Sequence, residues 1–152
     1  MHLVTTVKKI LQGKEKGKIL KYEDYFAWFL VFLFAGIYCF MSINKHRLFE
    51  TYGWDLGVFD HGIWQWSLFK IPYSSFHDLP WLADHFHIIL ITIVPLYWIW
   101  PSVKLLVSVQ AVVTALGAAP LYYLSKKITK HRLFSLVVII GYLLFYSLQW
   151  HT

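Results

Sequence analysis

Residues 25–43 read YFAWFLVFLFAGIYCFMSI, and this stretch decides the fold class. Its 19 residues contain no charged side chain, and at about 1.5 Å per residue they form a helix that crosses a hydrocarbon core of about 30 Å. The stretch is too long for the apolar region of a signal peptide. NKHR follows at 44–47, where signal cleavage needs small residues. We therefore predict a retained membrane-spanning helix.

The composition of the whole chain also indicates an integral membrane protein. Of the 152 residues, 58% are hydrophobic and 14% are charged, whereas soluble domains have about 25% charged residues. The net charge of +6 comes largely from two basic clusters beside apolar segments, which is typical of membrane orientation signals and not of a nucleic-acid partner. Cys39 is the only cysteine, which excludes an intrachain disulfide. The clusters consist of Lys8, Lys9, Lys14, Lys16, Lys18 and Lys21, and of Lys126, Lys127, Lys130 and Arg132.

Three further apolar segments lie at 86–100, 105–124 and 133–150. The last two have the length of membrane-spanning helices, but 86–100 is short, contains Pro95 and ends in YWIW, as interfacial helices do. If 86–100 crossed the membrane, there would be four spans and the two basic clusters would lie on opposite sides. With three spans both clusters are cytoplasmic, and the positive-inside rule favours this arrangement.

The predicted fold is therefore an all-α integral membrane protein with three membrane-spanning helices, four being the alternative. A basic cytoplasmic tail precedes a polytopic domain in the cytoplasmic membrane, and a long loop lies on the outer side with two juxtamembrane helices. The boundaries are the tail at 1–24, the domain at 25–152, spans at about 25–43, 105–124 and 133–150, the outer loop at 44–103, and its helices at about 56–69 and 86–100.

The outer loop concentrates the polar chemistry of the chain. Between residues 44 and 100 it holds five of the eight acidic residues, six of the eight tryptophans and five of the eight histidines. Carboxylates and imidazoles among tryptophans, beside a bilayer, are what a lipid-facing active site requires. The acidic residues are Glu50, Asp55, Asp60, Asp78 and Asp84.

Asp55 and Asp60 stand five residues apart, near the start of the first loop helix. Five residues are 500° of helix rotation, so two carboxylates at this spacing point about 140° apart and do not form a ready pair. Two interpretations of Asp55 remain open. It lies before the helix as an N-cap, or it points into a cavity at the membrane surface, where partial desolvation suits a general base.

Asp84, His85 and His87 open the second loop helix. They predict a divalent metal site together with Asp55 or Asp60, a phosphate site, or imidazoles that bond lipid head groups; no zinc signature of recognised spacing is present. Arg47 is either a membrane-edge cation or the partner of a phosphate. The tryptophans form an aromatic belt or stack on a sugar ring or polyprenyl chain.

These residues resemble a specific family. The matching motifs are Arg47, Glu50-Thr51, DLGVFD at 55–60, Trp64, ADHF at 83–86, VPLY at 94–97, Gln110-Ala111, LGAAPLY at 116–122 and GYLL at 141–144. They resemble the bacterial and archaeal membrane proteins of the "domain of unknown function 2079" family over about 47–150. The chain departs from that pattern at His61, where glutamine is usual, and at His87-Ile88, where Ser-Pro is usual. These departures argue against a role for His61 or His87.

The resembled family looks like a branch of the GT-C glycosyltransferases, which take sugars from polyprenyl-phosphate donors. The resemblance implies that Asp55 is the catalytic base, that Asp60 and Asp84 position the acceptor or a metal, and that Arg47 and His85 hold the donor phosphate. Trp64 joins the substrate-binding set, and Asp55, Asp84 and His85 are the metal candidates. The link from fold to enzyme class is an analogy.

Members of the family are several times longer than this chain, so the resemblance covers their N-terminal module. If this chain is part of an enzyme, a C-terminal partner polypeptide is then expected to supply the rest of the substrate site. Partners are membrane lipid and the polyprenyl-phosphate sugar donor. Two other functions are carried forward: a non-catalytic lipid-binding or transport component, and an inactive fragment.

Overall fold

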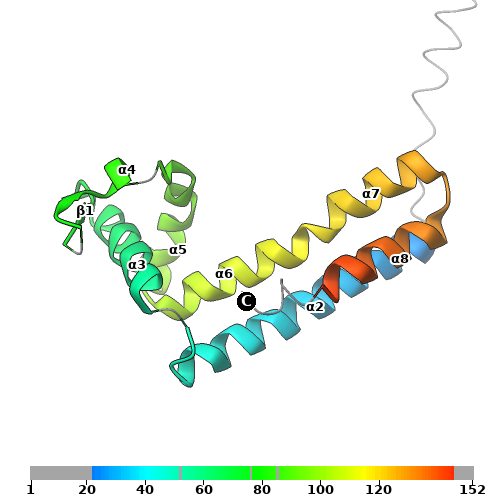
Figure 1. Cartoon of the computed structure of the whole chain (residues 1–152), viewed down its shortest axis with the longest axis horizontal. Helices are drawn as coiled ribbons and strands as arrows, with labels where there is room; N and C mark the ends of the chain where they lie inside the picture. Colours follow the sequence, from blue (N-terminus) through cyan, green and yellow to red (C-terminus); the bar gives the residue numbers. More distant parts are fainter. Residues whose placement is uncertain (1–21, 52, 76, 85, 146–152) are drawn as a thin grey trace, which may run out of the picture.

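The computed structural model describes residues 22–51, 53–75, 77–84 and 86–145, with the side chain of Asp84 left out (Figure 1). The predicted basic tail at 1–24 therefore lies almost entirely outside the described residues. Helices dominate the described part. In chain order the elements are α2 (Tyr22–Arg47), α3 (Gly53–Ser67), β1 (Tyr73–Ser74), β2 (Leu79–Pro80), α4 (Trp81–Asp84), the 3₁₀ helix η1 (Ile88–Ile93), α5 (Val94–Ile99), α6 (Val103–Leu116), α7 (Ala118–Thr129) and α8 (Arg132–Leu143).

Helices α2, α6, α7 and α8 form an elongated bundle (Figure 1). Two stretches in the described part are long and apolar enough to cross a membrane, α2 with 26 residues and Val103–Thr129 with 27. The predicted spans at 25–43 and 105–124 fall within them. The helix α8 has 12 residues, and the end of the segment at 133–150 lies outside the described residues.

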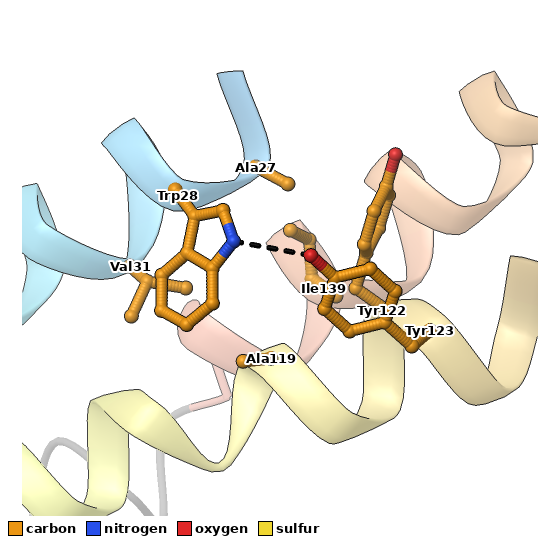
Figure 2. Close-up of a pocket in the computed structure, with 7 residues that line it drawn as sticks. All are labelled: Ala27, Trp28, Val31, Ala119, Tyr122, Tyr123 and Ile139. Atoms are coloured by element: carbon orange, nitrogen blue, oxygen red, sulfur yellow. Dashed lines mark hydrogen bonds between the residues drawn. The ribbon is translucent and has the colours of Figure 1, made fainter. Parts of the chain in front are cut away.

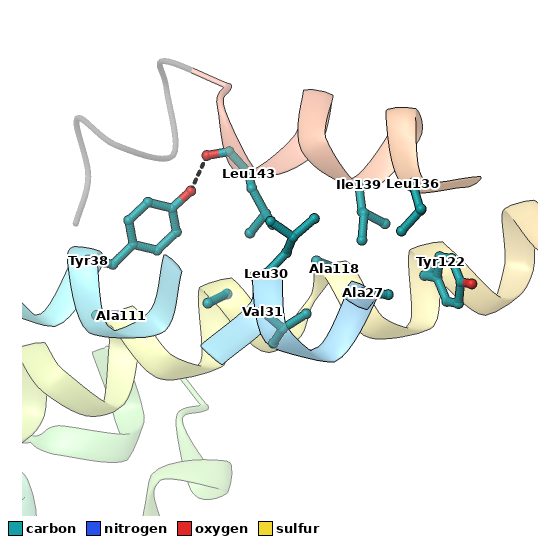
Figure 3. Close-up of a cluster of buried hydrophobic side chains, with 11 residues drawn as sticks. Ala27, Leu30, Val31, Tyr38, Ala111, Ala118, Tyr122, Leu136, Ile139 and Leu143 are labelled. Atoms are coloured by element: carbon teal, nitrogen blue, oxygen red, sulfur yellow. Dashed lines mark hydrogen bonds between the residues drawn. The ribbon is translucent and has the colours of Figure 1, made fainter. Parts of the chain in front are cut away.

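Small and branched apolar side chains fill the bundle core (Figure 3). Ala111, Ala115 and Ala118 are fully buried along α6 and α7, and they allow α2 to pack closely against that helix pair. At one end of this core the hydroxyl of Tyr38 donates a hydrogen bond to the carbonyl of Leu143, which ties α8 to α2. The cavity between α2, α7 and α8, where Trp28 Nε1 donates to the Tyr123 hydroxyl at 3.1 Å, measures only about 10 Å³ (Figure 2). It is too small for a sugar or a phosphate.

Gly117 joins α6 and α7 without reversing the chain. Its backbone stays in the right-handed helical region (φ −56°, ψ −23°), so the two helices run on as one bent rod. A Cβ at this position would lie 2.4 Å from the hydroxyl oxygen of Tyr142, which donates to the carbonyl of Thr114 at 2.9 Å. Pro120 fits because the first turn of a helix needs no partner for its missing N–H.

Charged side chains join the start of α2 to the end of α7 and the start of α8. The buried carboxylate of Asp24 accepts hydrogen bonds from the hydroxyl of Tyr122, at 2.8 Å, and from Lys126 Nζ. Arg132 pairs with Glu23 at 3.5 Å. The basic residues of the α7–α8 turn therefore lie at the end of the bundle where α2 begins (Figure 1).

The elements from α3 to α5, residues 53–99, form a separate end unit at the opposite end of the bundle. Helices α3 and α5 run across the long axis of the bundle, and α5 leads into α6 (Figure 1). Trp81, 1% exposed, is the centre of this unit and meets the rings of Phe59 and Trp66 edge to face. It lies directly on Gly62 of α3, where a Cβ would come within 2.5 Å of the indole.

Two details of the loop helices differ from the expectation. Helix α3 begins at Gly53, so Asp55 lies inside its first turn and not before the helix as an N-cap. The juxtamembrane helix expected at about 86–100 consists of a 3₁₀ helix followed by a short α-helix that starts at Val94. Pro95 explains the break, because its ring disfavours a helix continuing through it from the preceding turn but fits the first turn of a new helix.

Candidate functional site

Helix α3 carries both acidic candidates of the loop, but in different surroundings. Asp55 is exposed in the first turn, where the positive end of the helix dipole favours a carboxylate. Asp60 lies one and a half turns further on and is half-buried against α5. The two carboxylates therefore do not form a pair, as their spacing predicts.

Asp60 is held by Tyr97 of α5. The Tyr97 hydroxyl donates a hydrogen bond of 2.8 Å to Asp60 Oδ1, and the ring is buried. Burial of the phenol, the hydrogen bond and the nearby carboxylate raise the pKa of Tyr97 well above its ordinary value of 10.0. Tyr97 thus stays a neutral donor at physiological pH. It holds Oδ1 in place, and Oδ2 makes no hydrogen bond to the described part of the chain.

An open hollow of about 370 Å³ lies beside Asp60. Its lining residues are Gly57, Asp60, His61, Trp64 and Ser75. The four residues from α3 are spaced i, i+3, i+4 and i+7, so they share one face of the helix. Gly57 contributes backbone alone to this lining, one turn before Asp60. The volume falls within the range of small-molecule sites, roughly 300–1,000 Å³.

Gln65 fastens the β-hairpin to α3 beside this hollow. Its Oε1 accepts a hydrogen bond from the Tyr73 N–H at 2.6 Å, and its Nε2 donates to the Tyr73 carbonyl at 3.2 Å. The same Nε2 contacts Nε2 of His61. These bonds hold the hairpin turn, and with it Ser75, over the open face of α3.

Tyr73 also ties the two sides of the hairpin turn together. Its hydroxyl donates to Asp78 Oδ1 at 2.6 Å. This hydrogen bond is the main reason that the pKa of Tyr73 is raised, since it stabilises the protonated phenol. Asp78 therefore has a structural partner and does not line the hollow.

The remaining predicted site residues are not gathered at the hollow in the described part of the chain. Arg47 is the exposed last residue of α2, and it does not line the hollow. Asp84 ends α4, with its side chain outside the description, and His85 lies outside the described residues. His87 packs its ring on Phe59, at 4.9 Å between centroids, and on Trp81. Of the predicted set, the hollow brings together only Asp60 and Trp64.

No cluster of three metal-ligating side chains occurs among the described residues. Asp55 is exposed on a different side of α3 from Asp60, so those two carboxylates do not chelate one ion. A metal held by Asp55, Asp84 and His85 stays a prediction, because two of those side chains are not described.

Sequence reasoning missed Tyr97, Gln65, Gly57 and Ser75 as parts of this site. The signal for Gly57 was present, because it stands three residues before Asp60 and seven before Trp64 on one helical face. Tyr97 stands in the VPLY motif at 94–97, but its pairing with Asp60 spans 37 residues. Spacing along one helix does not reveal such a contact.

Comparison with known protein families gives a match that covers the outer loop and most of the bundle. A family described as "Predicted membrane protein (DUF2079)" matches residues 45–149. The match starts in the last turn of α2 and continues past α8, so it includes the whole end unit and the hollow. No curated protein and no solved structure matches the chain.

Proposed function

The chain belongs to the DUF2079 family of predicted membrane proteins, and on this premise we propose that it is a module of a membrane glycosyltransferase that uses a polyprenyl-phosphate sugar donor. One observation carries the proposal. The half-buried carboxylate of Asp60, fixed by Tyr97, borders an open hollow with an aromatic wall. A general base beside a substrate-sized hollow is what transfer to a hydroxyl acceptor requires.

The proposed membrane placement has three spans, formed by α2, by α6 with α7, and by α8. The end of the bundle that carries Lys126, Lys130 and Arg132 is cytoplasmic, in keeping with the positive-inside rule. The end unit then lies on the extracytoplasmic side of the cytoplasmic membrane. Its position at the other end of the bundle supports this (Figure 1).

Helices α3 and α5 act as the juxtamembrane helices of this arrangement. Both helices run across the bundle axis (Figure 1). If the bundle crosses the membrane, α3 and α5 therefore lie parallel to the membrane surface. Trp98, Ile99 and Trp100 are exposed at the end of α5, directly before the span that begins at Val103. Tryptophans at this point suit the head-group depth of a bilayer.

In the proposed reaction an acceptor hydroxyl attacks the anomeric carbon of the donor sugar. The bond from that carbon to the phosphate oxygen breaks, and polyprenyl phosphate leaves with the electron pair. The hydroxyl proton passes to the free Oδ2 of Asp60. We assign the base to Asp60 ahead of Asp55, because Asp60 lines the hollow and Asp55 does not. Asp55 is the second candidate, on the family resemblance alone.

The donor phosphate is placed outside the hollow. Among the described residues no lysine or arginine lines the hollow, and the carboxylate of Asp60 disfavours a second negative charge there. Arg47, at the exposed end of α2, is the proposed phosphate partner, since a guanidinium binds phosphate oxygens in pairs. His85 and Asp84 retain their proposed roles in holding the phosphate and positioning the acceptor or a metal.

A donor-consumption assay tests the function. The full chain is reconstituted in nanodiscs with a labelled polyprenyl-phosphate hexose and membrane extract as the acceptor source, and a nanodisc without protein is the control. We expect release of polyprenyl phosphate that depends on the protein. Binding of the donor without its consumption would instead assign the chain as a non-catalytic lipid-binding component, and neither binding nor consumption would contradict both functions.

A further inference from the structure

The hollow beside Asp60 is lined by groups that hydrogen-bond neutral polar atoms. It presents one carboxylate, one imidazole, one indole, one hydroxyl and the bare backbone of Gly57. This set offers hydrogen-bond acceptors, donors and one apolar face, but no positive charge for a phosphate. Such a lining selects a neutral ligand with several hydroxyl groups.

The hydrogen bonds of Gln65 determine which nitrogen of His61 carries the proton. Because Gln65 Oε1 accepts from the Tyr73 N–H, the orientation of the amide is set, and both hydrogens belong to Nε2. One of them goes to the Tyr73 carbonyl and the other faces His61 Nε2. His61 Nε2 is therefore the acceptor, and the neutral ring carries its proton on Nδ1. His61, which lines the hollow, therefore has the N–H of Nδ1 available as a hydrogen-bond donor.

The indole of Trp64 supplies the apolar face. The rings of His61 and Trp64 are stacked, 5.8 Å apart at an angle of 26°, so the imidazole supports the orientation of the indole. Trp64 stays 42% exposed even though it borders the hollow. The negative face of an aromatic ring attracts the slightly positive C–H groups on one face of a pyranose ring.

We infer that this hollow is a sugar subsite. A pyranose ring packs one C–H face on Trp64, donates a hydroxyl hydrogen to Asp60 Oδ2 and accepts a hydrogen bond from His61 Nδ1. The inference rests on the proposed function only for the statement that the bound sugar is the acceptor, whose hydroxyl then loses its proton to Oδ2. The binding itself does not depend on that reaction. His61 gains a role here that its departure from the family pattern argued against.

Binding of soluble glycosides to the full chain in nanodiscs tests the subsite. Saturation-transfer NMR is recorded with methyl β-glucopyranoside, methyl α-mannopyranoside and N-acetylglucosamine, and with choline as an ammonium probe. We expect at least one glycoside to bind saturably, with the strongest transfer to protons on one face of its ring. Replacement of Trp64 by alanine is expected to weaken that binding about tenfold.

Two further variants show whether weaker binding by Trp64→Ala comes from loss of the aromatic ring or from misfolding. Trp64→Phe keeps an aromatic face and should retain most of the binding. Trp100→Ala is the matched control, because Trp100 is 48% exposed, similar to Trp64, but does not line the hollow, and this variant should bind as the wild type does. Equal binding by Trp64→Ala and wild type, preference for choline, or no binding of any glycoside would overturn the subsite. Glycoside binding without donor consumption would retain the subsite and contradict the proposed transfer reaction.

Discussion

The hydroxyl of Tyr97 on α5 lies 2.8 Å from Oδ1 of Asp60 on α3, and this hydrogen bond joins two helices 37 residues apart at the edge of the hollow. Because Tyr97 is buried and its pKa is raised, its hydroxyl keeps its proton and acts as the hydrogen-bond donor to Oδ1. The bond therefore determines which oxygen of Asp60 faces the hollow. Tyr97 is a positioning residue for Asp60 in this account.

Tyr97→Phe tests that positioning role through pH dependence. The phenol has a higher pKa folded than unfolded, so its contribution to the free energy of unfolding is fully present below about pH 10, the ordinary tyrosine value, and is lost as the pH rises above it. We expect the stability difference between wild type and Tyr97→Phe to shrink above about pH 10. Tyr25→Phe, at an exposed position of α2, is the control and should give a constant difference. Denaturant unfolding in detergent across pH 8–11 measures both, and a difference independent of pH would contradict the role.

Gly62→Ala is expected to destabilise the end unit. The new Cβ would lie 2.5 Å from the indole of Trp81, which is buried and has no room to withdraw. Overpacking of this kind costs about 1–3 kcal/mol. Gly36→Ala in α2 meets nothing within 4 Å and should be neutral or stabilising by about 1 kcal/mol, since alanine favours helix. Thermal unfolding in detergent compares the two, and equal midpoints would show that Trp81 does not pack on α3 as described.

Asp24→Ala is expected to loosen the bundle at its basic end. The change removes the acceptor of both Tyr122 and Lys126, so we expect a loss of about 2 kcal/mol in the free energy of unfolding. The half-exposed pair between Glu23 and Arg132 provides the comparison, and Glu23→Gln should cost below about 1 kcal/mol. If the two variants unfolded alike, the buried contacts of Asp24 would not stabilise the bundle.

Single-cysteine labelling tests the number of spans. Cys39 is the only native thiol, so Cys39→Ser provides a background for His77→Cys in the end unit and Lys130→Cys at the α7–α8 turn. With three spans, a membrane-impermeant maleimide added to intact cells should label the first variant and not the second. Labelling of both from outside would indicate four spans and would contradict the placement proposed for α6 and α7.

Apolar length predicted the helices of the bundle, because a long run without charges has few alternatives to a membrane-spanning helix. Local rules served less well in the outer loop. The helical segment expected at about 86–100 is divided at Val94 into a 3₁₀ helix and a short α-helix, and the sequence did not reveal this division. Helix α3 begins at Gly53 and not at about residue 56 as expected, so Asp55 lies in its first turn. Helix boundaries inferred from sequence commonly differ by a few residues.

The site was predictable only where it lies on one helix. Asp60 and Trp64 stand one turn apart, and their shared face follows from helix geometry. The contributions of Tyr97 and of the hairpin depend on how α5 and Tyr73 pack against α3. Such contacts between distant segments arise from tertiary packing, which periodicity does not encode. The structure does not describe the side chain of Asp84 or any part of His85, so their predicted roles stay predictions.

The rate of sugar transfer by Asp60→Asn, measured beside Asp55→Asn, tests the central claim most directly. Asparagine keeps the size of the side chain and can still accept the Tyr97 hydrogen bond, but it cannot take a proton from an acceptor. We predict that Asp60→Asn lowers the rate at least about a hundredfold, as loss of a general base does, while donor binding stays intact. Glu50→Gln, at an exposed loop position that does not line the hollow, should transfer at the wild-type rate. Wild-type transfer by Asp60→Asn would contradict the account, and a loss in Asp55→Asn alone would move the base to the first turn of α3.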